Sequence, residues 1–466
     1  MNFDAIIDGY KDEMIDKITE IVKIRSVEGE AKEGMPFGKE VDEAFKYALN
    51  LSQELGFEIK NVDGYGGHAE YGEGDELVGV LVHLDIVPEG NGWSSSPFDV
   101  TIKDGKMYGR GVSDNKGPAI ASLYALKALK ESGVQINKKI RIIFGLNEET
   151  RWQGLDYYFK KEKSPDMAFV PDADFPIIYA EKGILDFFIS KEFKVDDSQK
   201  IRVTSLDGGN AMNSVPDICE AVLKIDEEDL SNLMDRINDI IEKNNFDIIW
   251  TESKGDLHIK SSGTGAHGSM PESGFNAISQ MVCFLSEILD KDNAIYDFVK
   301  FYKDKIGMEY NGQSLGCDYD DDVTGKLTLN VGTIELEENE VKIGVDVRYP
   351  VKIDKDLVIE KLESAVNEFK GKLIIDDILL PKYIPLDSPL AQTLLETYRE
   401  CTGDYESQPM TMGGATYARV TENAVAFGGL FPGRKETAHQ NDEYIHVVDL
   451  IKMTKIFAKA MYKLTK

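Results

Sequence analysis

Cysteine, long apolar runs and positive charge are all scarce in this sequence. Its 466 residues include four cysteines, Cys219, Cys283, Cys317 and Cys401, and their spacing contains no C-x-x-C motif of a metal or redox site. We therefore expect four separate thiols rather than a disulfide framework. No apolar stretch approaches the length of a membrane span, and the N-terminus lacks the segments of a signal peptide. These absences predict a cytoplasmic protein.

The deficit of positive charge limits the partners that the protein can bind. Acidic residues outnumber basic residues by 83 to 53, which gives a net charge of −30. A field of this sign repels phosphate backbones and anionic lipid surfaces, so we expect no nucleic-acid partner and no membrane partner. The chain is longer than the size at which single hydrophobic cores usually stop growing, which predicts more than one domain.

Strand and helix patterns alternate over the first part of the chain. Apolar residues at helical spacing predict a helix over 4–24, and residues 77–82 form a continuous apolar run, which is typical of a strand buried on both faces. A helix over 118–131 and strands over 139–146 and 167–170 follow. This alternation predicts an α/β sheet, in which functional groups gather beyond the carboxyl ends of the strands.

The pattern changes at about residue 184. Alternating strands and helices occur there in a similar order twice, which predicts an α+β domain made of two related halves, although no clear sequence repeat is present. The α/β pattern then returns and ends in an amphipathic helix over 447–463. We therefore expect one α/β domain formed by residues 1–183 and 384–466, with a second domain, residues 184–383, inserted into it.

Histidine and carboxylate residues follow three of the predicted strands. His83 and Asp85 end the first, Glu148 and Glu149 follow the second, and Asp172 follows the third. Residues two apart on a strand point to the same side, so Asp85 is placed to orient the His83 imidazole as a ligand. Two adjacent carboxylates at a buried strand end repel each other unless a cation compensates them.

Two more candidates lie in loops. Asp114 precedes the helix predicted over 118–131, where the helix dipole favours a carboxylate, and His439 lies in a polar loop before the last helix. Imidazole and carboxylate groups together suit divalent cations, and one carboxylate shared by two ions is usual in cocatalytic hydrolases. The candidate metal ligands are His83, Asp114, Glu149, Asp172 and His439.

Each candidate also has a purely structural interpretation. His83 taken alone is as compatible with a packed histidine at a strand end, and Asp114 with a helix cap. Asp174 competes with Asp172 as the acidic group after the third strand. The run from Ser113 to Lys116 matches the S-x-x-K of penicillin-binding enzymes, but the companion K-T-G is absent. The set as a whole therefore favours a metal site more than any single member does.

Three of these motifs resemble a known family. His83-Leu84-Asp85, Ser113-Asp114-Asn115-Lys116-Gly117 and Asn147-Glu148-Glu149 resemble motifs of the metallopeptidase family that includes aminoacylase, glutamate carboxypeptidase and succinyl-diaminopimelate desuccinylase, and in particular its bacterial PepV-type dipeptidases. Motifs from about residue 77 to 446 occur in the family order. The resemblance implies a mixed-sheet α/β catalytic domain with an inserted α+β lid domain made of two related halves.

The resemblance also implies how the metal ligands are shared. One ion would be bound by His83, Asp114 and Asp172, and the other by Asp114, Glu149 and His439, so that Asp114 bridges the two. Zinc fits these mixed ligands best, and manganese and cobalt suit the same groups.

Two further roles near the ions follow from the resemblance. Glu148 would be the general base that takes a proton from a water bridging the two ions, and Asp85 would support His83. The family often has a second aspartate after the bridging one, where this chain has Asn115. We do not expect Asn115 to be a ligand.

The inserted segment contains three residues that resemble the family's substrate-binding groups. His267, in Ala-His-Gly-Ser-Met-Pro, resembles the histidine that stabilises the oxyanion. Asn213 and Arg348 resemble binders of the substrate carboxylate, Arg348 by a forked contact. Gly414, beyond the insert, resembles part of the family's glycine loop beside the substrate. The simpler alternatives are a loop histidine, a turn former and a surface ion-pair residue. Dimeric relatives have an insert of about half this length, so we expect an active site complete in a monomer, with a homodimer as the alternative.

The implied reaction is metal-dependent hydrolysis of the peptide bond of dipeptides, with a small peptide as the partner. An amidase or deacylase acting on N-acyl amino acids is the alternative, since the same metal site serves both reactions. Metal binding without catalysis would require loss of the general base, and Glu148 is present. A nucleotide site at Gly72-Glu73-Gly74 is disfavoured because no helix pattern follows that loop.

Overall fold

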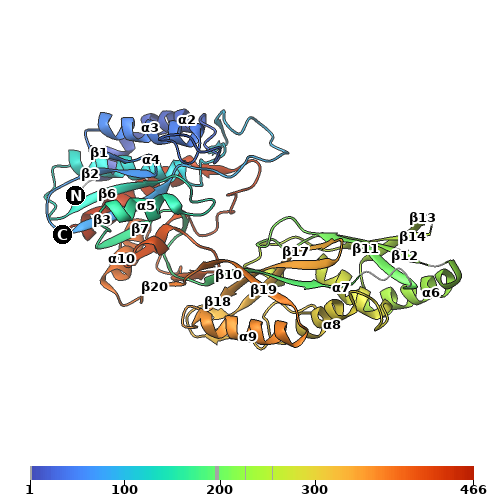
Figure 1. The fold of residues 1–466 in the computed structure, drawn as a ribbon. Coiled ribbons are helices and arrows are strands. Elements are labelled where there is room, and N and C mark those ends of the chain that lie inside the picture. The colour runs from blue at the N-terminus through green and yellow to red at the C-terminus, as the bar shows by residue number, and fades with distance from the viewer. Residues whose placement is uncertain (1–2, 195–198, 226, 254) are drawn as a thin grey trace. The chain divides into compact units, whose positions relative to one another are not determined.

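The structure is a computed structural model, which describes residues 3–194, 199–225, 227–253 and 255–466 (Figure 1). The chain forms two compact units. The first comprises Met1–Ala180, Tyr383–Thr411 and Ala415–Lys466, and the second comprises Glu181–Lys382 and Met412–Gly414. Each unit has its own hydrophobic core.

The first unit is built on a mixed sheet. Nine strands of the described chain form it, in the order β1-β2-β6-β3-β7-β22-β9-β20, with β21 beside β9. Their bounds are β1 Glu58–Val62, β2 Gly66–Tyr71, β3 Leu77–His83, β6 Lys139–Gly145, β7 Met167–Val170, β9 Ile178–Glu181, β20 Lys382–Tyr383, β21 Met410–Met412 and β22 Ala424–Ala426. Strand β3 is parallel to β6 and β7, and β7 is parallel to β22, whereas β1–β2 and β2–β6 are antiparallel. The predicted mixed α/β sheet is therefore confirmed.

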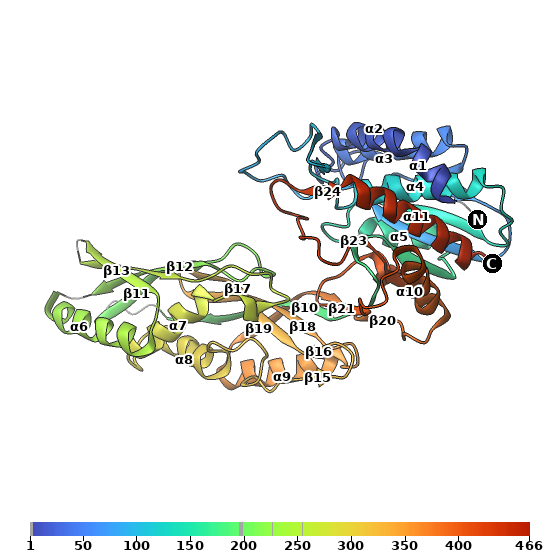
Figure 2. The same ribbon diagram turned by 180° about the vertical axis from the view of Figure 1, so that it is seen from behind.

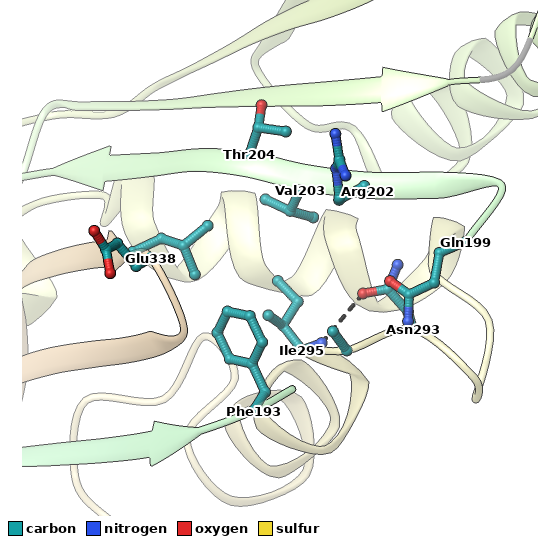
Figure 3. Close-up of a pocket in the computed structure, with 10 residues that line it drawn as sticks. Phe193, Gln199, Arg202, Val203, Thr204, Asn293, Ile295 and Glu338 are labelled. Carbon is teal, nitrogen blue, oxygen red and sulfur yellow. Dashed lines mark hydrogen bonds between the residues drawn. The ribbon is translucent and has the colours of Figure 1, made fainter. Parts of the chain in front are cut away.

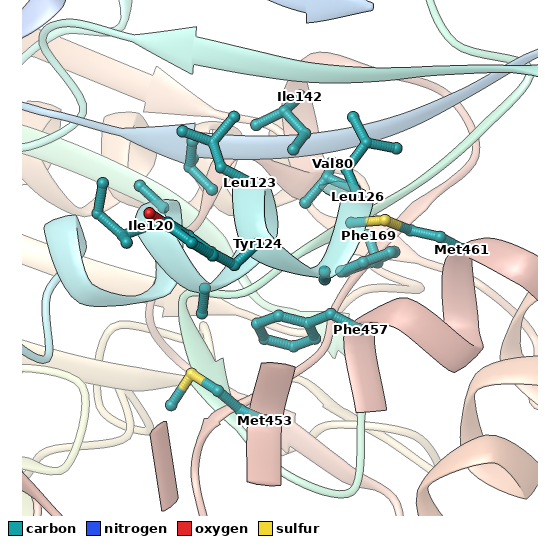
Figure 4. Packing of buried hydrophobic residues seen from close by; sticks show 14 of the residues in the cluster. Val80, Ile120, Leu123, Tyr124, Leu126, Ile142, Phe169, Met453, Phe457 and Met461 are labelled. Carbon is teal, nitrogen blue, oxygen red and sulfur yellow. The ribbon is translucent and has the colours of Figure 1, made fainter. Parts of the chain in front are cut away.

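Helices cover both faces of the central strands. The helices of the first unit are α1 Phe3–Gly9, α2 Lys11–Val22, α3 Lys39–Glu54, α4 Lys116–Glu131, α5 Gln153–Lys161, α10 Pro389–Thr402 and α11 Val447–Leu464. On β3, Val80 packs with α4 and α11, whereas its neighbour Leu81 joins the cluster that includes α5. Figure 4 shows Val80 and Ile142 near Leu126 of α4 and Phe457 of α11. Burial on both faces explains why these strands are apolar throughout.

The N-terminal helix differs from its prediction. Residues 4–24 were expected to form one helix, but α1 and α2 are separated at Tyr10. The Tyr10 N–H bonds to the Ile7 carbonyl, three residues back instead of four, at 2.9 Å. Gly9 precedes this break, and glycine is a weak helix former.

Short strands pair the connecting segments that lie outside the central sheet. Strands β4 Thr101–Lys103, β5 Lys106–Tyr108 and β24 Tyr444–His446 form a small sheet in the order β24-β5-β4. Strands β8 Ala173–Asp174 and β23 Gly429–Leu430 pair in parallel. The β5–β24 pair brings the segment before Asp114 next to the segment after His439.

The second unit is an antiparallel sheet with helices on one face (Figure 2). Eight described strands have the order β13-β14-β12-β11-β17-β18-β10-β19. Their bounds are β10 Gly183–Glu192, β11 Ile201–Gly208, β12 Ile218–Ile225, β13 Ile248–Ser253, β14 Asp256–Ser262, β17 Thr328–Glu337, β18 Glu340–Tyr349 and β19 Lys372–Leu379. The helices are α6 Glu227–Asn244, α7 Ala277–Ile288, α8 Tyr296–Lys305 and α9 Lys355–Glu368, and a hairpin joins β15 Asp320–Asp321 to β16 Gly325–Lys326.

The sheet of the second unit consists of two strand groups that meet at β11 and β17. One group contains β11 to β14, and the other contains β10 and β17 to β19. Helix α8, which packs against α7, was not predicted. No helix among the described residues is both long enough and apolar enough to cross a membrane. All four cysteines are free thiols, as predicted.

Candidate active site

The first group of candidate residues lies where three neighbouring parallel strands end. Strand β3 lies between β6 and β7, and His83 at the end of β3 is in register with Gly145 at the end of β6. Glu148 and Glu149 follow β6, and Asp172 follows β7. The shared direction of the strands therefore brings together side chains that are far apart in the sequence.

His83 lies between two carboxylates. Its Nε2 is 2.9 Å from Asp114 Oδ1 and 3.5 Å from Asp172 Oδ2, and the side chain is buried. Its Nδ1 is 3.0 Å from the backbone carbonyl of Asp85. Because a carbonyl only accepts hydrogen bonds, Nδ1 carries the hydrogen and the Nε2 lone pair faces the carboxylates. A positive charge at Nε2, either a proton or a metal ion, is required to make this contact favourable.

His439 repeats this arrangement on the other side of Asp114. Its Nε2 is 3.0 Å from Asp114 Oδ2 and 3.0 Å from Glu149 Oε2. Asp114 thus directs one oxygen toward each imidazole. His439 has a φ of 62°, a left-handed conformation that is uncommon for residues other than glycine and that recurs at functional sites.

The two adjacent glutamates are buried without full compensation. Glu148 Oε1 and Glu149 Oε1 have no hydrogen-bond partner among the described residues. Burial raises the pKa of Glu148 well above its usual value, although the nearby His83 opposes this shift. Burial, aided by the charge of Asp114, raises the pKa of Glu149 to about 7. Negative charge at these two positions is therefore costly in the protein by itself.

The histidines respond in the opposite direction. Burial lowers the pKa of His439, but hydrogen bonds to Asp114 and Glu149 outweigh this effect and raise it to about 11. Burial likewise opposes ionisation of Asp114, yet its hydrogen bonds with His439 and His83 hold its pKa well below the usual range. The cluster is thus stabilised by positive charge. Its imidazole nitrogens and carboxylate oxygens are ligands that suit divalent zinc, manganese or cobalt.

Two overlapping triads have the spacing of a metal site. The ligand atoms of His83, Asp114 and Glu149 lie within 4.8 Å of one another, as do those of His83, Glu148 and Asp172. The expected general base, Glu148, is therefore within reach of the ligand set.

The two acidic residues that follow the third strand have different surroundings. Asp172 lies beside His83, whereas Asp174 belongs to β8, which pairs with β23. Burial and the charge of Glu436 raise the pKa of Asp174 to about 6. Neither Asp174 nor His439 is in either triad of the described residues, but His439 contacts Asp114 and Glu149 directly.

Two neighbouring residues support the cluster differently from the expectation. The Asp85 carboxylate accepts the Glu149 N–H at 3.0 Å, and its closer contact with His83 is made through its carbonyl. Asn115 donates from Nδ2 to Asp172 Oδ1 at 2.9 Å and accepts the His83 N–H at 3.3 Å. Asn115 thus ties the ends of β3 and β7 together. Sequence reasoning excluded it as a ligand and missed this supporting role, for which its position beside Asp114 is the only signal.

His267 and Asn213 are neighbours in the second unit. Gly268 N–H donates to the Asn213 carbonyl at 2.7 Å, and both Asn213 and His267 are exposed. Ser269 N–H donates to His267 Nδ1 at 3.1 Å, so the hydrogen of the neutral imidazole lies on Nε2. His267 thereby presents a donor at Nε2. The serine two residues after His267 is a supporting residue that was not anticipated.

Arg348 and Gly414 lie in the second unit as well. The forked contact expected for Arg348 is already made within the protein, because Nε donates to Asp346 Oδ1 at 2.7 Å and Nη2 donates to Asp346 Oδ2. Arg348 Nη1 donates to the Gly413 carbonyl at 3.1 Å. The fork formed by Nε and Nη2 is therefore engaged by Asp346, and a contact with substrate would have to use the other edge of the guanidinium. Gly414 follows Gly413, whose backbone lies against Ser269.

A separate cavity in the second unit contains none of these residues. It has a volume of about 210 Å³ and is lined in part by Phe193, Arg202 and Val203 (Figure 3). Within its wall, the Asn293 side chain accepts the Ile295 N–H at 3.2 Å. The cavity is therefore not the candidate site.

Known proteins resemble this chain over its full length. Residues 79–463 match the family described as Peptidase family M20/M25/M40. "Putative dipeptidase YtjP" of Bacillus subtilis is 38% identical, and the alignment covers 100% of both chains. Human carnosine dipeptidase 1 is similar in structure, with a TM-score of 0.59 and 17% identity over 100% of this chain and 99% of that one. Aminoacylhistidine dipeptidase from Vibrio alginolyticus has a TM-score of 0.62 and 16% identity, over 97% and 96% of the chains.

Proposed function

Because the chain belongs to peptidase family M20/M25/M40 and is a hydrolase, we propose that it cleaves the peptide bond of dipeptides and depends on divalent metal ions. The observation that carries this proposal is the cluster centred on Asp114, where two imidazoles and buried carboxylates meet. The Bacillus subtilis relative, which is described as a putative dipeptidase, supports the choice of substrate.

The proposed ligands divide into two sets that share Asp114. His83, Asp114 and Asp172 would hold one ion, and Asp114, Glu149 and His439 would hold the other. The distances from each imidazole Nε2 to a different Asp114 oxygen support a bridging role for this carboxylate. Zinc is the proposed metal, and manganese and cobalt suit the same groups.

Glu148 is the proposed proton carrier. When bound, divalent ions would polarise the scissile carbonyl and lower the pKa of a water molecule. Glu148 would accept a proton at Oε1 and deliver it to the leaving amine. The buried Glu148 carboxylate supports this role because its Oε1 has no hydrogen-bond partner among the described residues and lies beside the proposed ligands.

The second unit would supply the groups that bind the substrate. His267 would donate from Nε2 to the negative charge that develops on the carbonyl oxygen, an interaction worth about 3–4 kcal/mol in comparable sites. Asn213 and Arg348 Nη1 would bind the terminal carboxylate beside Gly414. Variants His267→Ala and Arg348→Lys test these roles, since loss of the first should lower kcat and change of the second should raise KM. Unchanged kinetic constants would remove either residue from the mechanism.

We also propose that a single chain is active. The two strand groups of the second unit form one sheet, and an insert of this doubled length supports a site that a single chain can complete. Activity per chain should then stay constant on dilution while sedimentation reports a monomer. An obligate dimer that loses activity when diluted would overturn this proposal.

Metal analysis combined with a substrate panel tests the proposed function as a whole. Purified protein should contain about two divalent ions per chain, cleave free dipeptides, and lose activity with a chelator and regain it with zinc or manganese. A matching panel of N-acyl amino acids distinguishes a deacylase. Faster turnover of that panel would replace the dipeptidase proposal, and chelator-resistant turnover would overturn the metal dependence.

A further inference from the structure

Glu443 lies in the loop that carries His439, but it contacts the loop that carries Asp114. Its side chain is fully buried. Glu443 Oε1 accepts the backbone N–H groups of Ser113 at 2.8 Å and of Asp114 at 3.1 Å. The Gly111 N–H is 3.1 Å from both carboxylate oxygens. One side chain thus holds three amides of the segment that ends at Asp114.

Arg110 neutralises the buried charge of Glu443. Its Nη1 donates to Glu443 Oε2 at 2.8 Å, and only 1% of Arg110 is exposed. Arg110 is itself held on its other side, where the guanidinium stacks over Trp93 at 5.2 Å and Nη2 lies 3.4 Å from the Glu89 carbonyl. The Glu443 carboxylate thus accepts from four donors, which are Arg110 Nη1 and the N–H groups of Gly111, Ser113 and Asp114. These donors occupy its four lone-pair positions, so Glu443 has no capacity left to bind a cation.

The contacts of Glu443 fix the geometry between two proposed ligands. Strands β5 and β24 bring the two loops together, and the Gly109 N–H donates to the Glu443 carbonyl at 3.0 Å. Beyond those strands, neither Asp114 nor His439 lies in a helix or strand. The Glu443 side chain therefore connects the loop of Asp114 to the loop of His439, whose Nε2 is 3.0 Å from Asp114 Oδ2.

We propose that Glu443, held by Arg110, is a positioning residue that sets the metal geometry by locking the Asp114 loop to the His439 loop. This inference rests on the proposed function, because it requires Asp114 and His439 to be metal ligands. Removing the Glu443 charge would leave a buried guanidinium unpaired and weaken three amide contacts, so the loops would separate. Residues that support ligands in this way commonly change metal affinity by about 10–100-fold.

The test compares Glu443→Gln with a control that breaks a similar pair elsewhere in the unit. In the control pair, Arg141 on β6 donates from Nε to Oε2 of Glu70 on β2, and Glu70 is buried. Neither residue belongs to the Asp114 loop or the His439 loop. Wild type, Glu443→Gln and Glu70→Gln are titrated with cobalt(II), and the visible absorption spectrum, the cobalt affinity and Tm are measured. Both variants should lower Tm, but only Glu443→Gln should alter the spectrum and weaken cobalt binding by about 10-fold or more.

Several outcomes would overturn the proposal. A wild-type cobalt spectrum and affinity in Glu443→Gln would reduce Glu443 to a structural residue. If Glu443→Gln does not fold, Arg110→Lys decides, because it retains the acceptor but loosens its anchor, and an unchanged cobalt spectrum in that variant would also contradict positioning. If the wild type itself bound no cobalt or zinc, the proposed function would fall first and this inference with it, which distinguishes the two failures.

Discussion

In the first unit, Glu148 and Glu149 bury carboxylate oxygens that have no hydrogen-bond partner among the described residues, whereas in the second unit Asp346 is buried against both arms of Arg348. The two regions bury the same chemical group in different ways. The negative charge of a carboxylate paired with an arginine is compensated within the protein. The charge of a carboxylate that lies among other carboxylates and imidazole nitrogens is compensated only when a positive charge is added. The difference separates an ion pair that holds the structure together from a site built for a cation.

Asp186 in the second unit represents a third case. It lies directly opposite Asp346 on the adjacent strand, and burial together with the charge of Asp346 raises its pKa to about 7. The single arginine nearby is already engaged by Asp346. Burial therefore favours the protonated form of Asp186 more strongly than that of an ordinary carboxylate.

The largest expected effect is on turnover. Glu148→Gln should lower kcat by about 10²- to 10⁴-fold, because the proton acceptor is lost while the ligands remain. Metal content and Tm should stay close to those of the wild type. Steady-state kinetics, elemental analysis and thermal unfolding measure these three quantities, and retained turnover would exclude Glu148 as the base.

Asp346, the carboxylate paired with Arg348, should contribute to stability whether or not metal is bound. Asp346→Asn leaves the Arg348 guanidinium buried beside a neutral amide, which should reduce the free energy of unfolding by about 3–5 kcal/mol. The loss should be equal with and without a chelator in denaturant titrations. A loss of stability that appears only when metal is present would contradict the distinction between a structural ion pair and a cation site.

A matched pair of variants sharpens the boundary of the metal site. Asp172→Asn should weaken binding of one ion, because the carboxylate 3.5 Å from His83 Nε2 becomes a poor ligand. Asp174→Asn changes a carboxylate two residues away and should retain both ions and turnover. Isothermal titration with zinc after removal of bound metal gives the two stoichiometries. The reverse result would exchange the roles of these two residues.

The smallest effect concerns Asp186 and depends on pH. Its pKa is higher in the folded chain than in the unfolded chain, so its contribution to stability is complete at low pH and is lost as pH rises from about 4 toward 7. Asp186→Asn removes this loss. The variant should match the wild type near pH 4 and exceed it by about 1–3 kcal/mol at pH 8. Equal stabilities at both pH values would mean that Asp186 is not buried against Asp346.

Part of the site could be predicted because it depends on strand direction. His83, Glu149 and Asp172 each follow an apolar run, and neighbouring parallel strands necessarily bring such residues to one edge. The inserted segment was expected over 184–383, and the second unit of the structure runs over Glu181–Lys382 with Met412–Gly414 added. Those three residues join it through contacts such as Arg348 Nη1 to Gly413.

The remaining features depend on contacts that leave no periodic signal. The link from Glu443 to the Asp114 loop joins a side chain to backbone amides far away in the sequence, and such pairs have no pattern in a single sequence. The use of the Arg348 fork by Asp346 was missed for the same reason. The break at Tyr10 interrupts an amphipathic pattern that continues on both sides, so apolar spacing alone predicted one helix.

The comparison between the regions is tested most directly by the stability of Glu149→Gln with and without zinc at pH 8. Without metal, the wild type carries a buried carboxylate whose pKa is about 7, so the variant should be at least as stable as the wild type in calorimetry. With zinc, the wild type should gain stability through binding and the variant should gain less. The order of the two Tm values should therefore reverse. A variant that is less stable than the wild type by the same amount in zinc and in chelator would contradict a cation site in the first unit.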